Sequence, residues 1–226
     1  MTTGLRRLTP LTACLTIALM AGACDTPSPA PPVKPSTQAP AASEPPEASP
    51  TADPPALEIV GAAPDDLHDV DWPNTPAPGE VCGVPGLVQF DADGTATATS
   101  TTWGLVRILR GKEVLYGDTD GDHRDEAAVY VGCLDNGATQ NGQIAAGYVI
   151  YTHAGGKLAA LGTITPRQTG QYPTALARVE FAPGRIIAHE KWYRPGDPHC
   201  CPGGDATTVW TRKGNRLTPG DPRITS

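Results

Sequence analysis

The region after residue 57 alternates between apolar and polar side chains with a period of two. Ala177, Val179 and Phe181 are separated by charged residues, and residues 207–212 alternate in the same way. This periodicity is typical of a β-strand that buries one of its two faces. No stretch of this region shows the 3.6-residue periodicity of a long amphipathic helix. The pattern therefore predicts a domain built from strands.

Short segments that contain glycine separate the predicted strands. Connections of two to five residues with glycine are typical of β-hairpins. One short helical turn is expected at residues 65–70, between Pro64 and Pro73. We therefore expect a mainly β domain, an antiparallel meander of about eight strands that forms a barrel-like sheet or a sandwich. The predicted turns are at residues 110–112, 153–156, 183–184 and 213–215.

The first 24 residues have the organisation of a bacterial export signal. Arg6 and Arg7 precede an apolar run at residues 11–20, which is too short to span a bilayer. The small residues at 21–23 are followed at once by Cys24, as in a lipobox. We predict that residues 1–24 are a lipoprotein signal peptide and that Cys24 is acylated, which places the protein on the outer face of the cytoplasmic membrane. The alternative is ordinary cleavage and free secretion.

Two further segments follow the predicted signal peptide. Residues 25–56 contain 11 prolines and seven alanines and almost nothing large and apolar, so they predict a disordered tether. Residues 57–226 are long enough for a single domain with a real core. The chain carries 24 acidic residues against 17 basic ones. Because no basic run exceeds two residues, nucleic-acid binding is not expected.

The domain retains four cysteines after signal cleavage: Cys82, Cys133, Cys200 and Cys201. An even number of cysteines in an exported protein predicts two disulfides. Of the three pairings, a bond between adjacent cysteines is the least expected, because the small ring strains the peptide between them. We therefore expect Cys82 and Cys133 each to pair with one member of the adjacent pair.

A metal site is the alternative for the adjacent cysteines. Asp197 and His199 lie in the same loop, and thiolates with imidazole suit zinc or copper(I). However, the spacing matches no C-x-x-C arrangement, and an oxidising compartment converts thiols to disulfides.

An acidic loop at residues 118–126 is the most distinctive chemical feature of the chain. Asp118, Asp120 and Asp122 occupy alternate positions, and Glu126 closes the segment. Alternate carboxylates in a tight loop converge on one point, and the backbone carbonyl of Arg124 adds a further oxygen. Ca²⁺ prefers six to eight oxygen ligands. The loop therefore predicts a calcium site, with calcium as the candidate cofactor.

The calcium hypothesis has a simpler alternative. The loop resembles those of FG-GAP, VCBS and dockerin-type repeats, but His123 stands where these families have glycine, and the loop occurs once. Aspartates also favour turns because their side chains bond nearby backbone N–H groups. The same residues are thus consistent with a hairpin turn that binds no ion.

Several motifs together resemble a family of actinobacterial exported proteins related to the LppP/LprE lipoproteins. They are the segment at 70–74 before Cys82, the acidic turn before Cys133, and the Cys200-Cys201-Pro202 motif before the strand at 208–210. The similarity covers most of residues 65–217. It implies a β-rich domain outside the cytoplasm and implies no reaction.

The sequence contains no complete catalytic constellation, since the hydrolase, metalloprotease, P-loop and dinucleotide motifs are all absent. We therefore expect a non-catalytic binding or interaction module for an envelope component. The alternative is an envelope hydrolase with an unrecognised acidic site. Trp72, Trp103, Trp192 and Trp210 are expected to be mostly core, although Trp192 and Tyr193 suit a binding rim.

Overall fold

The computed structural model describes residues 57–136 and 142–226. The predicted signal peptide, the lipidation site at Cys24 and the predicted tether lie outside the described residues. Within the described part, strands dominate and all strand pairs are antiparallel. The predicted mainly β, antiparallel fold is therefore confirmed.

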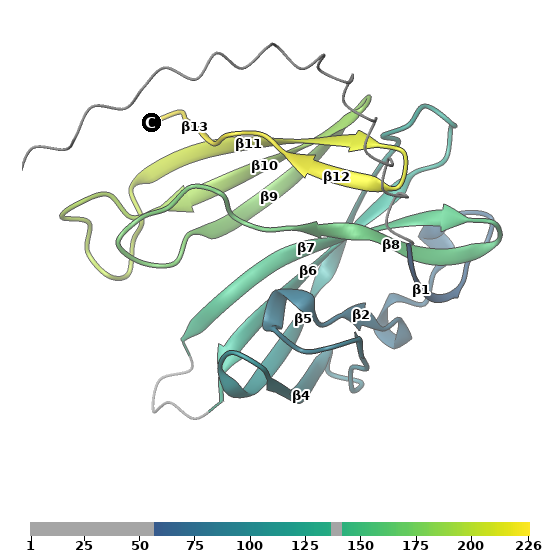
Figure 1. The fold of residues 1–226 in the computed structure, drawn as a ribbon, viewed down its shortest axis with the longest axis horizontal. Helices are drawn as coiled ribbons and strands as arrows, with labels where there is room; N and C mark the ends of the chain where they lie inside the picture. The colour runs from purple at the N-terminus through teal and green to yellow at the C-terminus, as the bar shows by residue number, and fades with distance from the viewer. Residues whose placement is uncertain (1–56, 137–141) are drawn as a thin grey trace, which may run out of the picture. The chain divides into compact units, whose positions relative to one another are not determined.

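The larger sheet has six strands and is a meander with one added strand (Figure 1). Its strand order is β1-β8-β7-β6-β5-β4, so strands that follow one another in sequence are neighbours. Gly155 and Gly156 form a two-residue turn between β7 and β8, and both have the positive φ that such hairpin turns need. The strands are β1 (Glu58–Ala62), β4 (Thr95–Ser100), β5 (Gly104–Gly117), β6 (Glu126–Asp135), β7 (Gln143–Ala154) and β8 (Lys157–Ile164).

The second sheet is formed by the C-terminal part of the chain and lies beside the larger one (Figure 1). Its order is β12-β11-β10-β9, and β13 pairs with β11. The turns at 183–184 and 214–215 are where the glycines predicted them. The turn predicted at 110–112 is wrong, because these residues lie within β5 where its register with β6 shifts. The strands are β9 (Ala175–Ala182), β10 (Arg185–Trp192), β11 (Gly204–Lys213), β12 (Arg216–Pro219) and β13 (Arg223–Ile224).

A segment of short elements precedes β4. The expected helical turn at 65–70 is present as a 3₁₀ turn, η1 (Leu67–Asp69), capped by the carboxylate of Asp66. Two more 3₁₀ turns, η2 (Trp72–Asn74) and η3 (Glu80–Cys82), follow it. A small two-stranded sheet pairs β2 (Ala77–Pro78) with β3 (Leu87–Val88). Short strands such as these bring the described total to thirteen, above the eight expected from the longer alternating segments.

The larger sheet is buried on both faces. Side chains of a strand point alternately to opposite faces, and on β6 Val129 and Val131 pack with the N-terminal segment whereas Ala128 faces the second sheet. One core therefore lies between the large sheet and residues 63–90. The other lies between the two sheets and includes Tyr148, Ile150, Leu161, Ile164, Leu176, Val179, Ile186, Ala188, Trp210 and Leu217.

Candidate functional site

The acidic loop joins β5 to β6 and is organised first by Asp118. Its carboxylate accepts hydrogen bonds from the backbone N–H groups of Gly121 (2.7 Å), Asp120 (3.1 Å) and His123 (3.1 Å). These donors, that of Gly121 above all, lower the pKa of Asp118 below its ordinary value. His123 has a φ of 66°, so it takes the left-handed conformation that glycine adopts most readily. The loop is thus a turn held by its own aspartate.

Glu126 lies at the end of this loop and is almost fully buried. Its carboxylate accepts the backbone N–H of Thr119 (2.8 Å) and the hydroxyls of Thr119 and Thr152. Arg212 from β11 donates from Nη1 to Glu126 at 2.6 Å and from Nη2 to Asp120 at 2.8 Å. The Arg212 side chain is 9 % exposed and that of Glu126 is 4 % exposed. A buried ion pair therefore ties the second sheet to the loop of the first.

The structure brings together three of the five predicted calcium ligands. Carboxylate oxygens of Asp118, Asp120 and Glu126 lie within 4.8 Å of one another. Asp122 is not in this group, because its carboxylate accepts the backbone N–H of Arg124 instead (2.9 Å). The guanidinium of Arg212, which the sequence pattern did not single out, already forms ion pairs with two of these carboxylates, those of Asp120 and Glu126. Calcium binding stays a prediction. The loop does form the turn, held by aspartate side chains, that the alternative hypothesis describes.

Asp120 shows how the charges in this cluster compete. Partial burial and the neighbouring carboxylate of Glu126 raise the pKa of Asp120, although the guanidinium of Arg212 acts in the opposite direction. The carboxylates of Asp120 and Glu126 therefore share the single positive charge of Arg212. An unbalanced negative charge remains at the surface of the loop.

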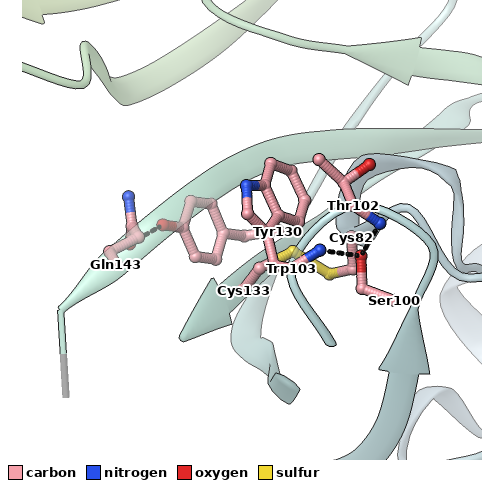
Figure 2. The surroundings of a disulfide bond; sticks show 7 residues. All are labelled: Cys82, Ser100, Thr102, Trp103, Tyr130, Cys133 and Gln143. Atoms are coloured by element: carbon pink, nitrogen blue, oxygen red, sulfur yellow. Dashed lines mark hydrogen bonds between the residues drawn. A yellow bond between two sulfur atoms is a disulfide. The ribbon is translucent and has the colours of Figure 1, made fainter. Parts of the chain in front are cut away.

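The predicted disulfide pairing is wrong. Cys82 of η3 is bonded to Cys133 of β6, with Cα atoms 5.5 Å apart (Figure 2). Cys200 is bonded to Cys201. The physical reason is placement, because η3 packs on β6 in the N-terminal core whereas the adjacent cysteines lie in the loop after β10. The spacing of the cysteines along the chain does not indicate which of them lie close together in the fold.

The loop that carries the adjacent cysteines is shaped by hydrogen bonds to the carboxylate of Asp197. Asp197 accepts the backbone N–H groups of Arg194 and Gly203, each at 2.8 Å, and these bonds lower its pKa. His199 packs its ring on Tyr172 at 4.1 Å between centroids. Within the described residues, no cluster of metal-ligating side chains includes Asp197 or His199.

A cleft of about 840 Å³ lies beside β7. One wall is the start of β7, and the opposite wall is the connection between β8 and β9 at residues 165–174. Glu80 is the only charged residue among the described residues that line the cleft. The other lining residues are amides, hydroxyls, prolines, small residues and the aromatic rings of Tyr172 and Trp210, namely Val81, Gln143, Ile144, Ala145, Ala146, Thr163, Thr165, Pro166, Gln168, Thr169, Gly170, Gln171, Pro173, Thr174 and Pro219.

Two contacts hold the polar edge of this cleft in place. Gln143 accepts a hydrogen bond from the hydroxyl of Tyr130 at 2.7 Å, next to the Cys82–Cys133 bond (Figure 2). Tyr172 contacts Tyr193 edge-on, with ring centroids 5.1 Å apart. Tyr193, which was expected at a binding rim, therefore packs behind the cleft and holds the ring of Tyr172 in its lining.

A buried carboxylate positions the opposite wall. Glu190 of β10 is 1 % exposed and accepts the backbone N–H groups of Arg167 (2.9 Å) and Gln168 (2.7 Å). Its other oxygen accepts the hydroxyl of Thr208 at 2.6 Å. Because buried polar groups are costly unless hydrogen-bonded, this arrangement fixes the path of the connection after β8. Glu190 shares the inward face of β10 with Ile186 and Ala188, so alternation could have placed it inward, but alternation does not show its partners in the distant segment at 167–168.

Comparison of the chain with family models, with curated proteins and with solved structures finds no match. The resemblance to the LppP/LprE lipoproteins therefore stays a prediction. In residues 57–136 and 142–226, no helix has the length and apolar character that crossing a membrane requires.

Proposed function

We propose that the protein is an exported lipoprotein whose β domain binds an uncharged component of the cell envelope in the cleft beside β7, without catalysing a reaction. The observation that carries this proposal is the lining of the cleft, where Glu80 is the only charged residue among those described. A volume of about 840 Å³ is in the range of ligand sites, and amides with aromatic rings suit an uncharged polar ligand.

The alternative of an envelope hydrolase receives less support from the same cleft. A glycosidase of the usual kind needs two carboxyl groups about 5–9 Å apart across the bond that is cleaved. The described lining offers one carboxylate, and it offers no histidine or cysteine. The acidic cluster at Asp118, Asp120 and Glu126 lies elsewhere and is partly neutralised by Arg212.

The cleft is tested by filling it. Thr169 is exposed on the cleft wall, and Thr97 is exposed on β4 at the edge of the large sheet. In a Cys24→Ala background, which removes the acyl anchor, we expect Thr169→Trp to reduce co-sedimentation of the protein with isolated cell envelopes at least tenfold, and Thr97→Trp to leave it unchanged. Equal binding of the two variants would refute the cleft as the binding site.

The membrane anchor is tested separately. Two or three acyl chains on Cys24 would hold the protein stably at the membrane, because each buried CH₂ contributes about 0.8 kcal/mol. Cys24→Ala should move the protein from the membrane fraction to the medium. Release of the unchanged protein into the medium would contradict the anchor and favour free secretion. Retention of Cys24→Ala in the membrane fraction would show that acylation of Cys24 is not what holds the protein there.

A further inference from the structure

The cleft meets β7 at its edge rather than on one of its faces. Residues 143–146 all line the cleft, although they follow one another along the strand. Successive side chains of a strand point to opposite faces. A hollow that contacts every residue of a run therefore lies along the side of the strand, where the backbone N–H and C=O groups point.

Within residues 57–136 and 142–226, no strand pairs with this side of β7 at residues 143–146. On its other side, the start of β7 pairs with β6, as in Ala145 opposite Cys133. Pairing with β8 begins only at Tyr148, which lies opposite Ile164, the last residue of β8. Beyond that point the chain departs as the connection 165–174. Among the described residues, no backbone hydrogen bond reaches residues 143–146 across the cleft.

The local sequence leaves room for another backbone at this edge. Ala145 and Ala146 have the smallest side chains that a strand residue other than glycine can have, so they do not screen the backbone. The register with β6 shifts beside Ile144, a β-bulge of the kind that is frequent at sheet rims next to binding sites. The opposite wall is held at a fixed path by the carboxylate of Glu190. The cleft is therefore bounded by a free strand edge and a braced wall.

A free edge inside a cleft has a specific chemical complement. An extended peptide satisfies alternate N–H and C=O groups of a strand by adding a strand to the sheet. The four residues span about 13 Å of strand, the length of four to five ligand residues, and alternate residues among them present their N–H and C=O groups to the cleft. Because no described cation lines the cleft, it offers nothing to a terminal carboxylate, and an internal, uncharged segment fits best.

We propose that the cleft binds an extended, uncharged peptide segment that adds a strand to the free edge of β7 at residues 143–146. This inference rests on the proposed function, namely that the cleft is the binding site, and it names the class of ligand. Prolines and the rings of Tyr172 and Trp210 contact the side chains of the peptide, while its backbone pairs with β7.

The probe is a panel of hexapeptides without charged side chains, acetylated and amidated at their ends, titrated into the mature full-length chain. We expect members of the panel to bind and N-methylation at alternate positions to weaken binding at least tenfold in one register but not in the other. Hydrogen exchange of the backbone amides of residues 143–146 should slow at least tenfold at alternate positions. Residues 97 and 99 on the edge strand β4 serve as the internal control.

The outcomes separate this inference from the proposed function. If N-methylation has no effect in either register, or if no peptide binds while Thr169→Trp still abolishes envelope binding, the peptide inference is overturned and the cleft stays a binding site. Binding of neutral oligosaccharides such as maltohexaose, lost in Thr169→Trp, has the same meaning. If Thr169→Trp leaves envelope binding intact, the cleft is not the binding site and the proposed function is refuted.

Discussion

Arg212 of the second sheet and Glu126 of the first form a buried ion pair, with Nη1 and Oε1 separated by 2.6 Å. The backbone reinforces this link, because the N–H of Gly184 donates to the carbonyl of Thr119 (2.7 Å) and the N–H of Arg212 donates to the carbonyl of Gly184 (3.0 Å). The pair thus joins the acidic loop to the hairpin of β9 and β10 and to β11. The loop that sequence analysis assigned to a cation is held by a side chain of the protein itself.

Removal of Arg212 should be strongly destabilising. Arg212→Ala leaves the carboxylate of Glu126 buried without its counter-charge, and loss of one partner of a buried pair costs about 3–5 kcal/mol. The free energy of unfolding, measured in urea, gives this cost. Arg216→Ala, at an exposed position at the start of β12, is the matched control and should change it by less than about 0.5 kcal/mol. The double variant Arg212→Met with Glu126→Gln should recover most of the loss, and failure to do so would contradict the charge argument.

Calcium should add little to stability while Arg212 is in place. A ligand that binds only the folded state raises the midpoint of thermal unfolding by mass action. Because the guanidinium already forms ion pairs with the carboxylates of Asp120 and Glu126, Ca²⁺ would have to compete with it, and we expect the same midpoint in EDTA and in millimolar Ca²⁺. A clear rise in Ca²⁺ that disappears in Asp118→Ala and Asp120→Ala would instead establish the predicted calcium site.

Glu190 should control the wall of the cleft. Glu190→Gln replaces one acceptor oxygen by a donor that faces N–H or O–H groups, and a lost hydrogen bond to a buried charged group costs about 2–3 kcal/mol. The amides of Arg167 and Gln168 should then exchange faster with solvent. Glu180→Gln, whose carboxylate makes surface ion pairs on β9, is the control and should cost at most about 1 kcal/mol. Unchanged exchange at Arg167 and Gln168 would mean that Glu190 does not position this wall.

The features that local sequence determines were the predictable ones. Period-two alternation and paired glycines such as Gly155-Gly156 act over a few residues, so strands and hairpins followed from them. The cleft and its brace depend on contacts between distant segments, as between Glu190 and Arg167. Arg212 lies on the same face of β11 as the buried Thr208 and Trp210, but alternation does not show that a carboxylate of the other sheet meets it there.

The two disulfides should differ in how much they stabilise the fold, because one joins distant segments and the other joins neighbouring residues. In the loop-entropy model, the Cys82–Cys133 bond, with 51 residues of separation, contributes about 4 kcal/mol, so Cys82→Ala with Cys133→Ala should lose that amount. Cys200→Ala with Cys201→Ala removes a bond between neighbours and should cost much less. Urea unfolding compares the two variants. Mass spectrometry of the unreduced digest should find Cys82 joined to Cys133, and a peptide that joins either of them to the adjacent pair would restore the pairing expected from sequence.

Stability should fall in acid partly through Asp118. Its pKa is lowered in the folded state because the ionised carboxylate accepts backbone N–H groups, so its contribution is present above the unfolded pKa of about 3.9 and is lost as the pH falls through the folded value. Asp118→Asn should therefore be less stable than the unchanged protein at pH 7, and the difference should shrink towards zero near pH 2. Urea unfolding across this range measures it. Asp93→Asn, in another turn and with no side-chain hydrogen bond among the described residues, should show a small difference at every pH. A difference for Asp118→Asn that is independent of pH would show that its hydrogen bonds do not depend on its charge.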